Sequence, residues 1–139
     1  MTDDARAIVA QFLDGSPFVS FLNLSLVELD AQAGTVTMRM PMRPELERGG
    51  SMTGQFHGGA IAALIDTVGD LAVAVRVGGA VPTINFRVDY LRPSTGNALT
   101  ATATARRVGR TVGVADVDVM DEQGRLTAVG RGTYSAQPG

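Results

Sequence analysis

An alternation of apolar and polar residues predicts six β-strands in this chain. The side chains of a strand point to the two faces of a sheet in turn, so a half-buried strand is apolar at every second position. The pattern is clearest in residues 83–91, where the even positions share an apolar face and Thr83 falls on the polar face. Short connections rich in Gly, Pro and Asp favour antiparallel hairpins within 22–40 and within 83–134. The predicted strands are 22–29, 35–40, 83–91, 98–108, 111–120 and 125–134.

Residues 58–77 show a different pattern, because they are apolar on nearly every side. Their length and their many Ala and Leu residues favour a helix over a strand. Asp66 and Asp70 interrupt the segment, which argues against a span of a membrane. A helix that is apolar all round must be covered on most sides. Together with the strands, it predicts an α+β fold in which an antiparallel sheet wraps around one long central helix.

The remaining segments are shorter or irregular. Residues 3–14 carry the apolar stripe of a short amphipathic helix, which Gly15 ends. Residues 41–56 are expected to form a loop, and loops this long in a small domain are usually functional or mobile. Residues 135–139 are expected to be a frayed tail. No repeat or linker divides the chain, so residues 1–139 are predicted to form a single domain.

Composition restricts the possible chemistry. The chain of 139 residues is 45% apolar, has no cysteine and no lysine, and has His57 as its only histidine. A thiolate nucleophile, a disulfide framework, a cysteine-ligated zinc site and a lysine Schiff base are therefore excluded. A metal site built from several histidines of one chain is excluded as well, so no metal is expected. Catalysis would have to use carboxylates, hydroxyls, backbone amides, arginine or the imidazole.

The charge balance restricts the possible partners. A formal net charge of −2 argues against binding to nucleic acid or to an anionic membrane, because both require a basic face. The first residues include no basic segment followed by an apolar stretch, so no signal peptide is expected and the cytoplasm is the predicted location.

Two features of the long helical segment indicate a site. A carboxylate such as Asp66 is costly in a buried helix unless it is paired, hydrogen-bonded or used in catalysis. Asp70 lies one turn further on the same stripe, and periodicity does not distinguish the two. At the start of the helix, Gly58 lets a ligand approach free N–H groups, which favour an oxyanion. His57 is either a cap of that turn or a base.

The spacing of these features predicts a dimer. Gly58 and Asp66 are eight residues apart, or roughly 12 Å along a helix axis, so one small carbonyl group cannot contact both in the same chain. Two helices that run antiparallel across a two-fold axis would bring the start of one beside Asp66 of the other. A site built from both residues therefore implies a homodimer with two shared sites.

The segment Gly-Gln-Phe-His-Gly-Gly-Ala-Ile-Ala-Ala-Leu-Ile-Asp at 54–66 resembles the signature of the PaaI-like hotdog-fold acyl-CoA thioesterases, which is G-x-x-H-G-G with an Asp nine positions after the His. Residues 85–93, the Gly109-Arg110 turn and residues 124–134 extend the resemblance. It implies a hotdog fold, a homodimer or homotetramer, and hydrolysis of an acyl-CoA to free acid and coenzyme A. Coenzyme A is then part of the substrate, and the resemblance implies no separate cofactor.

The resemblance also implies roles for individual residues. Asp66, rather than Asp70, would be the catalytic base or nucleophile, and the Gly58 N–H of the other subunit would polarise the thioester carbonyl. His57 would shape the turn. Thr83 would hold the water near the aspartate, although an ordinary strand threonine explains it equally well.

One position departs from the family pattern. The family usually has Asn six residues before the histidine, where this chain has Ser51. Serine is shorter, so it would act through a water or retune the site. A Ser51 nucleophile assisted by His57 is disfavoured, because no third group is evident to orient the imidazole.

Contacts to the rest of the substrate are open to two interpretations. Arg92, Arg107 and Arg110 lie at strand ends, and guanidinium groups suit the phosphates of coenzyme A, but each could equally be solvated. Met52 and Phe56 are candidates for the acyl pocket, although packing of the loop is the simpler explanation.

Two other functions are compatible with a hotdog fold. An enoyl-CoA hydratase is disfavoured, because the chain lacks the neighbouring Asp and His in a loop that such enzymes carry. A non-catalytic acyl-CoA-binding protein, silenced at Ser51, is the main alternative. The chain length and the aryl or alkyl character of the acyl group are not indicated by the sequence.

Overall fold

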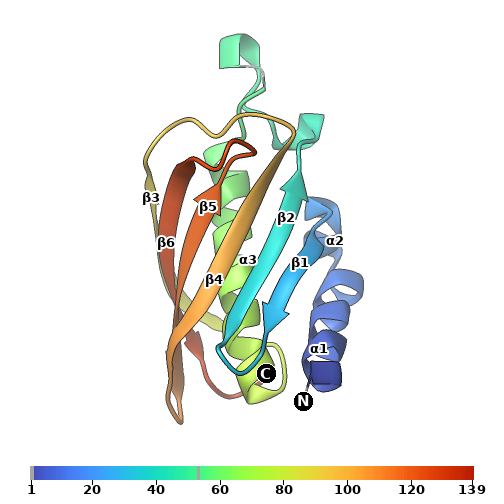
Figure 1. The fold of residues 1–139 in the computed structure, drawn as a ribbon, viewed down its shortest axis with the longest axis vertical. Helices are drawn as coiled ribbons and strands as arrows, with labels where there is room; N and C mark the ends of the chain where they lie inside the picture. The colour runs from blue at the N-terminus through green and yellow to red at the C-terminus, as the bar shows by residue number, and fades with distance from the viewer. Residues whose placement is uncertain (1, 53) are drawn as a thin grey trace.

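Six antiparallel strands form one sheet in the order β1-β2-β4-β5-β6-β3, and this sheet curls around the long helix α3 (Figure 1). The computed structural model describes residues 2–52 and 54–139. The helices are α1 (Thr2–Gly15), α2 (Pro17–Leu22) and α3 (Gly58–Val77), with short 3-10 helices η1 (Pro44–Leu46) and η2 (Gly50–Met52). The strands are β1 (Ser25–Asp30), β2 (Thr35–Pro41), β3 (Thr83–Tyr90), β4 (Ala98–Val108), β5 (Val112–Met120) and β6 (Leu126–Ser135). The predicted α+β architecture, a sheet around one central helix, is confirmed.

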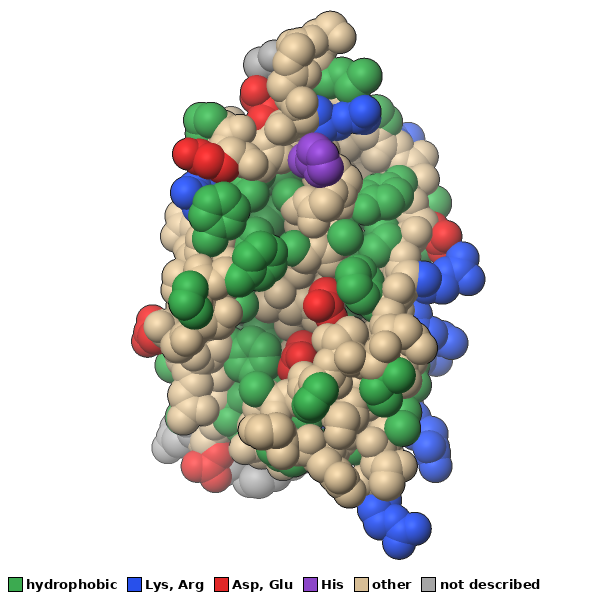
Figure 2. Space-filling view, turned by 180° about the vertical axis from the view of Figure 1, so that it is seen from behind, with side chains coloured by type: hydrophobic (Ala, Val, Ile, Leu, Met, Phe, Trp, Pro, Cys, Tyr) green, Lys and Arg blue, Asp and Glu red, His purple; other side chains and the backbone are tan. Residues whose placement is uncertain are grey.

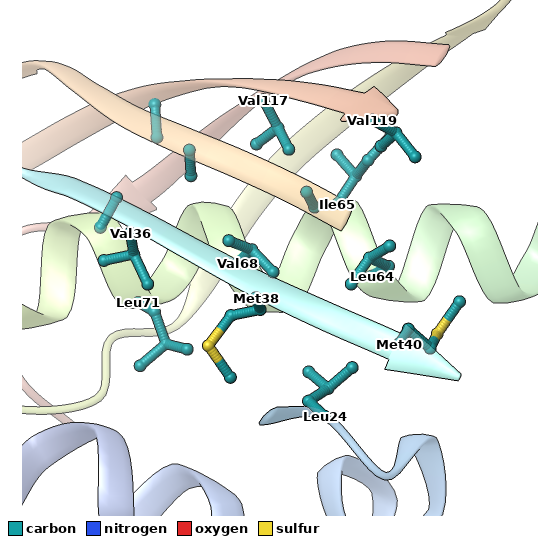
Figure 3. Close-up of a cluster of buried hydrophobic side chains, with 14 of the residues drawn as sticks. Leu24, Val36, Met38, Met40, Leu64, Ile65, Val68, Leu71, Val117 and Val119 are labelled. Atoms are coloured by element: carbon teal, nitrogen blue, oxygen red, sulfur yellow. The ribbon is translucent and has the colours of Figure 1, made fainter. Parts of the chain in front are cut away.

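Helix α3 begins and ends where the sequence predicts. His57 is its N-cap, and Gly78 ends it in the left-handed conformation with φ 94°, which glycine adopts without strain. The face of α3 toward the sheet is fully buried, and burial of each large apolar side chain contributes roughly 1.5–3 kcal/mol. Within the described residues, no helix is both long and apolar enough to cross a membrane. Figure 3 labels core residues Leu64, Ile65, Val68 and Leu71 of α3, Val36, Met38 and Met40 of β2, Val117 and Val119 of β5, and Leu24.

The first strand begins three residues later than predicted. Ser16 caps α2 by accepting a hydrogen bond from the Val19 N–H, and Pro17 occupies its first turn. Asn23 then ends α2 in the left-handed conformation with φ 56°. The alternation over residues 22–24 therefore belongs to a helix end, and the β1–β2 hairpin begins at Ser25.

The predicted hairpin from β3 to β4 is wrong, because β3 pairs with β6 at the edge of the sheet. The connection instead crosses the end of the sheet to reach β4, as Figure 1 shows. Hydrogen bonds hold it there: Ser94 Oγ donates to Thr127 Oγ1 at 2.8 Å, and the Asn97 N–H donates to Glu122 Oε1 at 2.7 Å. Turn residues show where a strand ends but not which strand it pairs with.

A bulge in β3 changes which side chains face the helix. Thr83 lies opposite Tyr134 of β6, whereas Asn85 lies opposite Thr133, so Ile84 is an extra residue on β3. Thr83 and Tyr90 both reach α3, although one is odd and the other even. The expectation that Thr83 lies on the face away from the even positions is therefore wrong.

The loop and the tail are held more firmly than their composition suggests. The arms of the loop before α3 pair with each other, with the Arg48 N–H donating to Gln55 O at 2.9 Å. At the C-terminus, which was expected to fray, the Ala136 N–H donates to Thr111 O at 2.9 Å and the Gly139 N–H donates to Ala80 O at 3.1 Å. Backbone pairing of this kind is not encoded in side-chain type.

Close contact between α3 and β6 depends on glycines that leave room for a tyrosine. The side chain of Tyr134 is fully buried between the helix and the strand. A Cβ atom on Gly69 would lie 2.3 Å from the Tyr134 hydroxyl oxygen, and one on Gly132 would lie 2.2 Å from it. A Cβ on Gly130 would lie 2.6 Å from Ile65. A side chain at any of these positions would force Tyr134 or Ile65 to shift within a closely packed interior.

Gly132→Ala is expected to lower the free energy of unfolding by about 2–3 kcal/mol, because the added methyl group overlaps a buried ring that has no room to move. Urea denaturation monitored by circular dichroism measures the change. Gly15→Ala is the matched control, since a Cβ there meets nothing within 4 Å. Equal stability of the two variants would contradict the conclusion that Gly132 is needed to leave room for Tyr134.

Candidate active site

The start of α3 presents an unpaired backbone donor. His57 accepts three hydrogen bonds in this turn: the Gly59 N–H donates to its Nδ1 at 2.8 Å, and the N–H groups of Ala60 and Ile61 donate to its carbonyl oxygen. Within residues 2–52 and 54–139, the Gly58 N–H donates to no acceptor. A free N–H at a helix start, with the helix dipole behind it, favours negative charge on a ligand oxygen.

A pocket of about 550 Å³ lies against this helix start. Tyr90 closes one side, where its hydroxyl donates to Gly58 O at 2.6 Å. Partial desolvation of the hydroxyl raises the pKa of Tyr90, although much of its ring is exposed, so the hydroxyl keeps its proton and acts as a donor. The lining also includes Phe56 and two arginines, Arg48 and Arg92. The pocket therefore combines the Gly58 N–H with the positive charges of two arginines.

Asp66 is held from two sides, two turns further along α3. Thr83 Oγ1 donates to its carboxylate Oδ1 at 2.8 Å, and the Tyr134 hydroxyl donates to its backbone oxygen at 3.0 Å. The Asp66 side chain is half-buried on the part of α3 that the sheet leaves open. Figure 2 shows this side of the molecule, where hydrophobic side chains gather around acidic ones. A carboxylate with one fixed oxygen can direct the other toward a substrate or a water.

Asp70 lies one turn beyond Asp66 and lines a second pocket of about 380 Å³ between α3 and the first two helices. Burial raises the pKa of Asp70 from 3.8 to about 7, the negative charge of Asp66 adds to the increase, and a hydrogen bond from the Val81 N–H opposes it. Asp70 is thus half-protonated near neutral pH.

The structure brings some of the predicted residues together. Phe56, His57, Gly58 and Arg92 line one pocket, and Asp66 bonds to Thr83 elsewhere on the helix. No described pocket contains both groups, as expected from their separation along one helix.

Four other predicted residues lie away from both groups. Ser51 and Met52 are exposed in η2 and line none of the described pockets. Arg107 and Arg110 belong to the β4–β5 hairpin, whereas η2 and the start of α3 lie at the opposite end of the molecule (Figure 1). The single chain therefore brings one arginine of the three, Arg92, to the helix start.

Three residues near the site were missed by the sequence analysis. Tyr90 lies on the apolar face of β3, and an aromatic residue with a hydroxyl two positions before Arg92 was a usable signal. Arg48 and Tyr134 had no comparable signal, because loop pairing and strand register place them. Among the described residues, no three His, Asp or Glu side chains gather as metal ligands would.

Comparison with known proteins places the chain in a family. Residues 53–128 match the thioesterase superfamily. A candidate esterase of Halobacterium salinarum is 40% identical over 142 residues, which cover 95% of this chain and 92% of that protein. The medium/long-chain acyl-CoA thioesterase YigI of Escherichia coli is 34% identical over 97 residues, which cover 57% of this chain and 61% of that protein.

Solved structures agree with this result. The Escherichia coli PaaI protein from the phenylacetic acid degradation operon superposes with a TM-score of 0.85 at 25% identity, covering 99% of this chain and 96% of that chain. A Shewanella oneidensis protein related to the thioesterase superfamily superposes with a TM-score of 0.87 at 29% identity, covering 98% and 97%. The chain therefore belongs to the thioesterase superfamily, so the predictions of a hotdog fold and of a thioester hydrolase are confirmed.

Asp70→Asn is expected to stabilise the protein at alkaline pH. Because the folded state raises the pKa of Asp70 to about 7 from 3.8, ionisation of Asp70 opposes folding. The free energy of unfolding therefore falls as the pH rises from about 4 to about 7, and above pH 7 ionisation of Asp70 lowers it no further. At about pH 8 the variant should therefore be more stable by about 1–4 kcal/mol, with little difference near pH 4. Thermal melts across this range test the sign; Asp118→Asn, at an exposed position on β5, is the control. An equal gain in stability at pH 4 and at pH 8 would contradict the raised pKa of Asp70.

Proposed function

We propose that the protein is an acyl-CoA thioesterase that hydrolyses its substrate to a free acid and coenzyme A. The observation that carries the proposal is the Gly58 N–H at the start of α3, which has no acceptor among the described residues, in a thioesterase-superfamily chain whose Asp66 carboxylate is held by Thr83. The N–H and the helix dipole stabilise the negative charge that develops on the thioester oxygen. Asp66 supplies the base or the nucleophile.

Two routes fit these groups. In the first route, a water oxygen bonds to the thioester carbon while its proton passes to Asp66; the C–S bond then breaks and the sulfur takes up the proton. In the second route, the Asp66 carboxylate bonds to that carbon and expels the thiolate, and water then hydrolyses the mixed anhydride. Thr83 serves both routes, because it fixes one carboxylate oxygen and leaves the other free.

The two groups are proposed to act on the same substrate from different subunits. Strand β3 ends the sheet, and four large apolar side chains on it or next to it are exposed: Ile84, Phe86, Tyr90 and Leu91. A long, apolar edge strand favours pairing with another chain. Two copies that pair through β3 would form an isologous dimer that covers this surface, and two such dimers would form a tetramer.

The pocket at the helix start is proposed to receive coenzyme A. Arg92 and Arg48 line it, and guanidinium groups bind phosphate oxygens through paired hydrogen bonds. Arg107 and Arg110 would reach the ligand only from a neighbouring subunit. No other cofactor is proposed, and the proposed location is the cytoplasm.

The chemical nature of the acyl group is the part of the substrate that is least specified. YigI is named for medium and long acyl chains and PaaI for phenylacetic acid degradation, so both alkyl and aryl thioesters are candidates. Met52 and Phe56 stay proposed contacts for the acyl group. The exposed position of Ser51 favours the one alternative, an acyl-CoA-binding protein without turnover.

A thiol-release assay with short, medium, long and aryl acyl-CoAs tests the function, and the protein adds no thiol of its own because it lacks cysteine. Asp66→Asn is expected to lower kcat at least about a hundredfold, because the group that activates water or attacks the carbonyl is lost. Asp118→Asn is the matched control. Acyl-CoA binding without turnover by the unmodified protein would favour the binding-protein alternative.

A hybrid dimer tests whether the site is shared. Gly58→Pro removes the proposed donor with little backbone strain, since proline is tolerated at the first helical position and His57, with φ −63° and ψ 140°, already has the conformation that precedes proline. The added Cβ would lie 3.4 Å from the Tyr90 ring, which is an ordinary contact distance. Each variant alone should be inactive. A dimer of one Asp66→Asn and one Gly58→Pro subunit, isolated through two affinity tags, should regain about half of the normal kcat, because one of its two sites is intact. An inactive hybrid would exclude a shared site.

A further inference from the structure

A pair of residues on neighbouring strands holds Asp66 by both its backbone and its side chain. Thr83 of β3 and Tyr134 of β6 lie directly opposite each other in the sheet. The Tyr134 hydroxyl donates to the Asp66 backbone oxygen at 3.0 Å, and Thr83 Oγ1 donates to its carboxylate at 2.8 Å. We propose that Tyr134 is a positioning residue for Asp66, which holds the reacting turn of α3 at a fixed height above the sheet. This inference rests on the proposed function of Asp66.

The hydroxyl of Tyr134 acts as a donor under all ordinary conditions. Its side chain is fully buried, and this burial, together with the negative charges of Asp66 and Asp70, raises the pKa of Tyr134. The phenol therefore keeps its proton. Its acceptor, the Asp66 backbone oxygen, lies in the middle of a regular helix, where a carbonyl group already has a partner within the helix. The extra bond is thus not needed to complete α3.

The surroundings of the ring restrict where the hydroxyl can be. Gly69 of α3 and Gly132 of β6 form the two walls of a slot in which an added Cβ would lie within 2.3 Å of the hydroxyl oxygen. Close packing of this kind leaves the phenol no alternative position. The hydroxyl is consequently a rigid point of attachment between the sheet and the turn that carries Asp66.

The bulge at Ile84 connects the two members of the pair. Without the extra residue, Thr83 would point away from α3, because side chains alternate along a strand. With it, Thr83 faces the helix opposite Tyr134, and both hydroxyls reach Asp66. The backbone and the carboxylate of Asp66 are therefore located by the same segment of the β3–β6 ladder.

Tyr134→Phe tests the proposal because it removes one oxygen and keeps the ring in its slot. A misplaced catalytic group slows the chemical step more than it weakens substrate binding, so kcat should fall roughly tenfold while KM stays within about twofold. Thr37→Val is the matched control, since it removes a hydroxyl that bonds to Thr102 at 3.0 Å on another pair of strands. The control should leave both constants unchanged.

A double-mutant cycle separates positioning from general stability. If Tyr134 acts through Asp66, Tyr134→Phe should have no further effect on the residual turnover of Asp66→Asn, whereas independent effects would multiply. If the Phe variant does not fold, 4-methylphenylalanine at position 134 fills the slot without a donor and takes its place. Insertion of 4-aminophenylalanine, which keeps a donor, should restore kcat.

The outcomes distinguish the two proposals. Unchanged kcat in a folded donor-free variant, with Asp66→Asn inactive, would overturn the role of Tyr134 and leave the proposed function intact. A Tyr134→Phe effect on kcat of the same size in the unmodified protein and in Asp66→Asn would also overturn the role of Tyr134. If the unmodified protein hydrolyses no acyl-CoA, or if Asp66→Asn keeps full activity, the proposed function fails and the inference fails with it.

Discussion

The close packing of α3 against β6 is the contact on which the rest of the structure depends. Gly69 on the helix and Gly130 and Gly132 on the strand leave space that Tyr134 and Ile65 fill. A side chain at Gly69 or Gly132 would displace the Tyr134 ring that bonds to Asp66, and one at Gly130 would displace Ile65. The same contact that stabilises the core therefore also determines where the candidate catalytic carboxylate lies.

A second constraint is that one chain covers only part of its central helix. The sheet buries one side of α3, while Asp66 and Asp70 lie half-buried on the side that it leaves open. An apolar helix with an open side needs a further layer. The exposed apolar residues of β3 lie at the edge of the same sheet, so the proposed second copy would both cover the helix and complete the proposed site.

The fold could be predicted wherever local pattern determines structure. The bounds of α3 follow from its largely apolar composition, with His57 and Gly78 as caps, and those of β4 follow from the alternation of its residues. The pairing of β3 could not be predicted, because the connection after it carries turn residues whichever strand lies beside it. The bulge at Ile84 was equally hidden, since one extra residue leaves the alternation of the sequence unchanged.

The candidate site also contains residues that the local sequence identifies and residues that only strand pairing places. Asp66 and Gly58 attract attention in the sequence because a charge and a glycine are unusual in an apolar helix. The groups that hold Asp66 are an ordinary strand threonine and a tyrosine near the C-terminus, and neither is unusual where it stands. Their roles depend on the register between β3 and β6, which joins residues 51 positions apart in the chain. The carboxylate is therefore visible in local sequence, whereas its orientation depends on strand pairing that only the folded sheet defines.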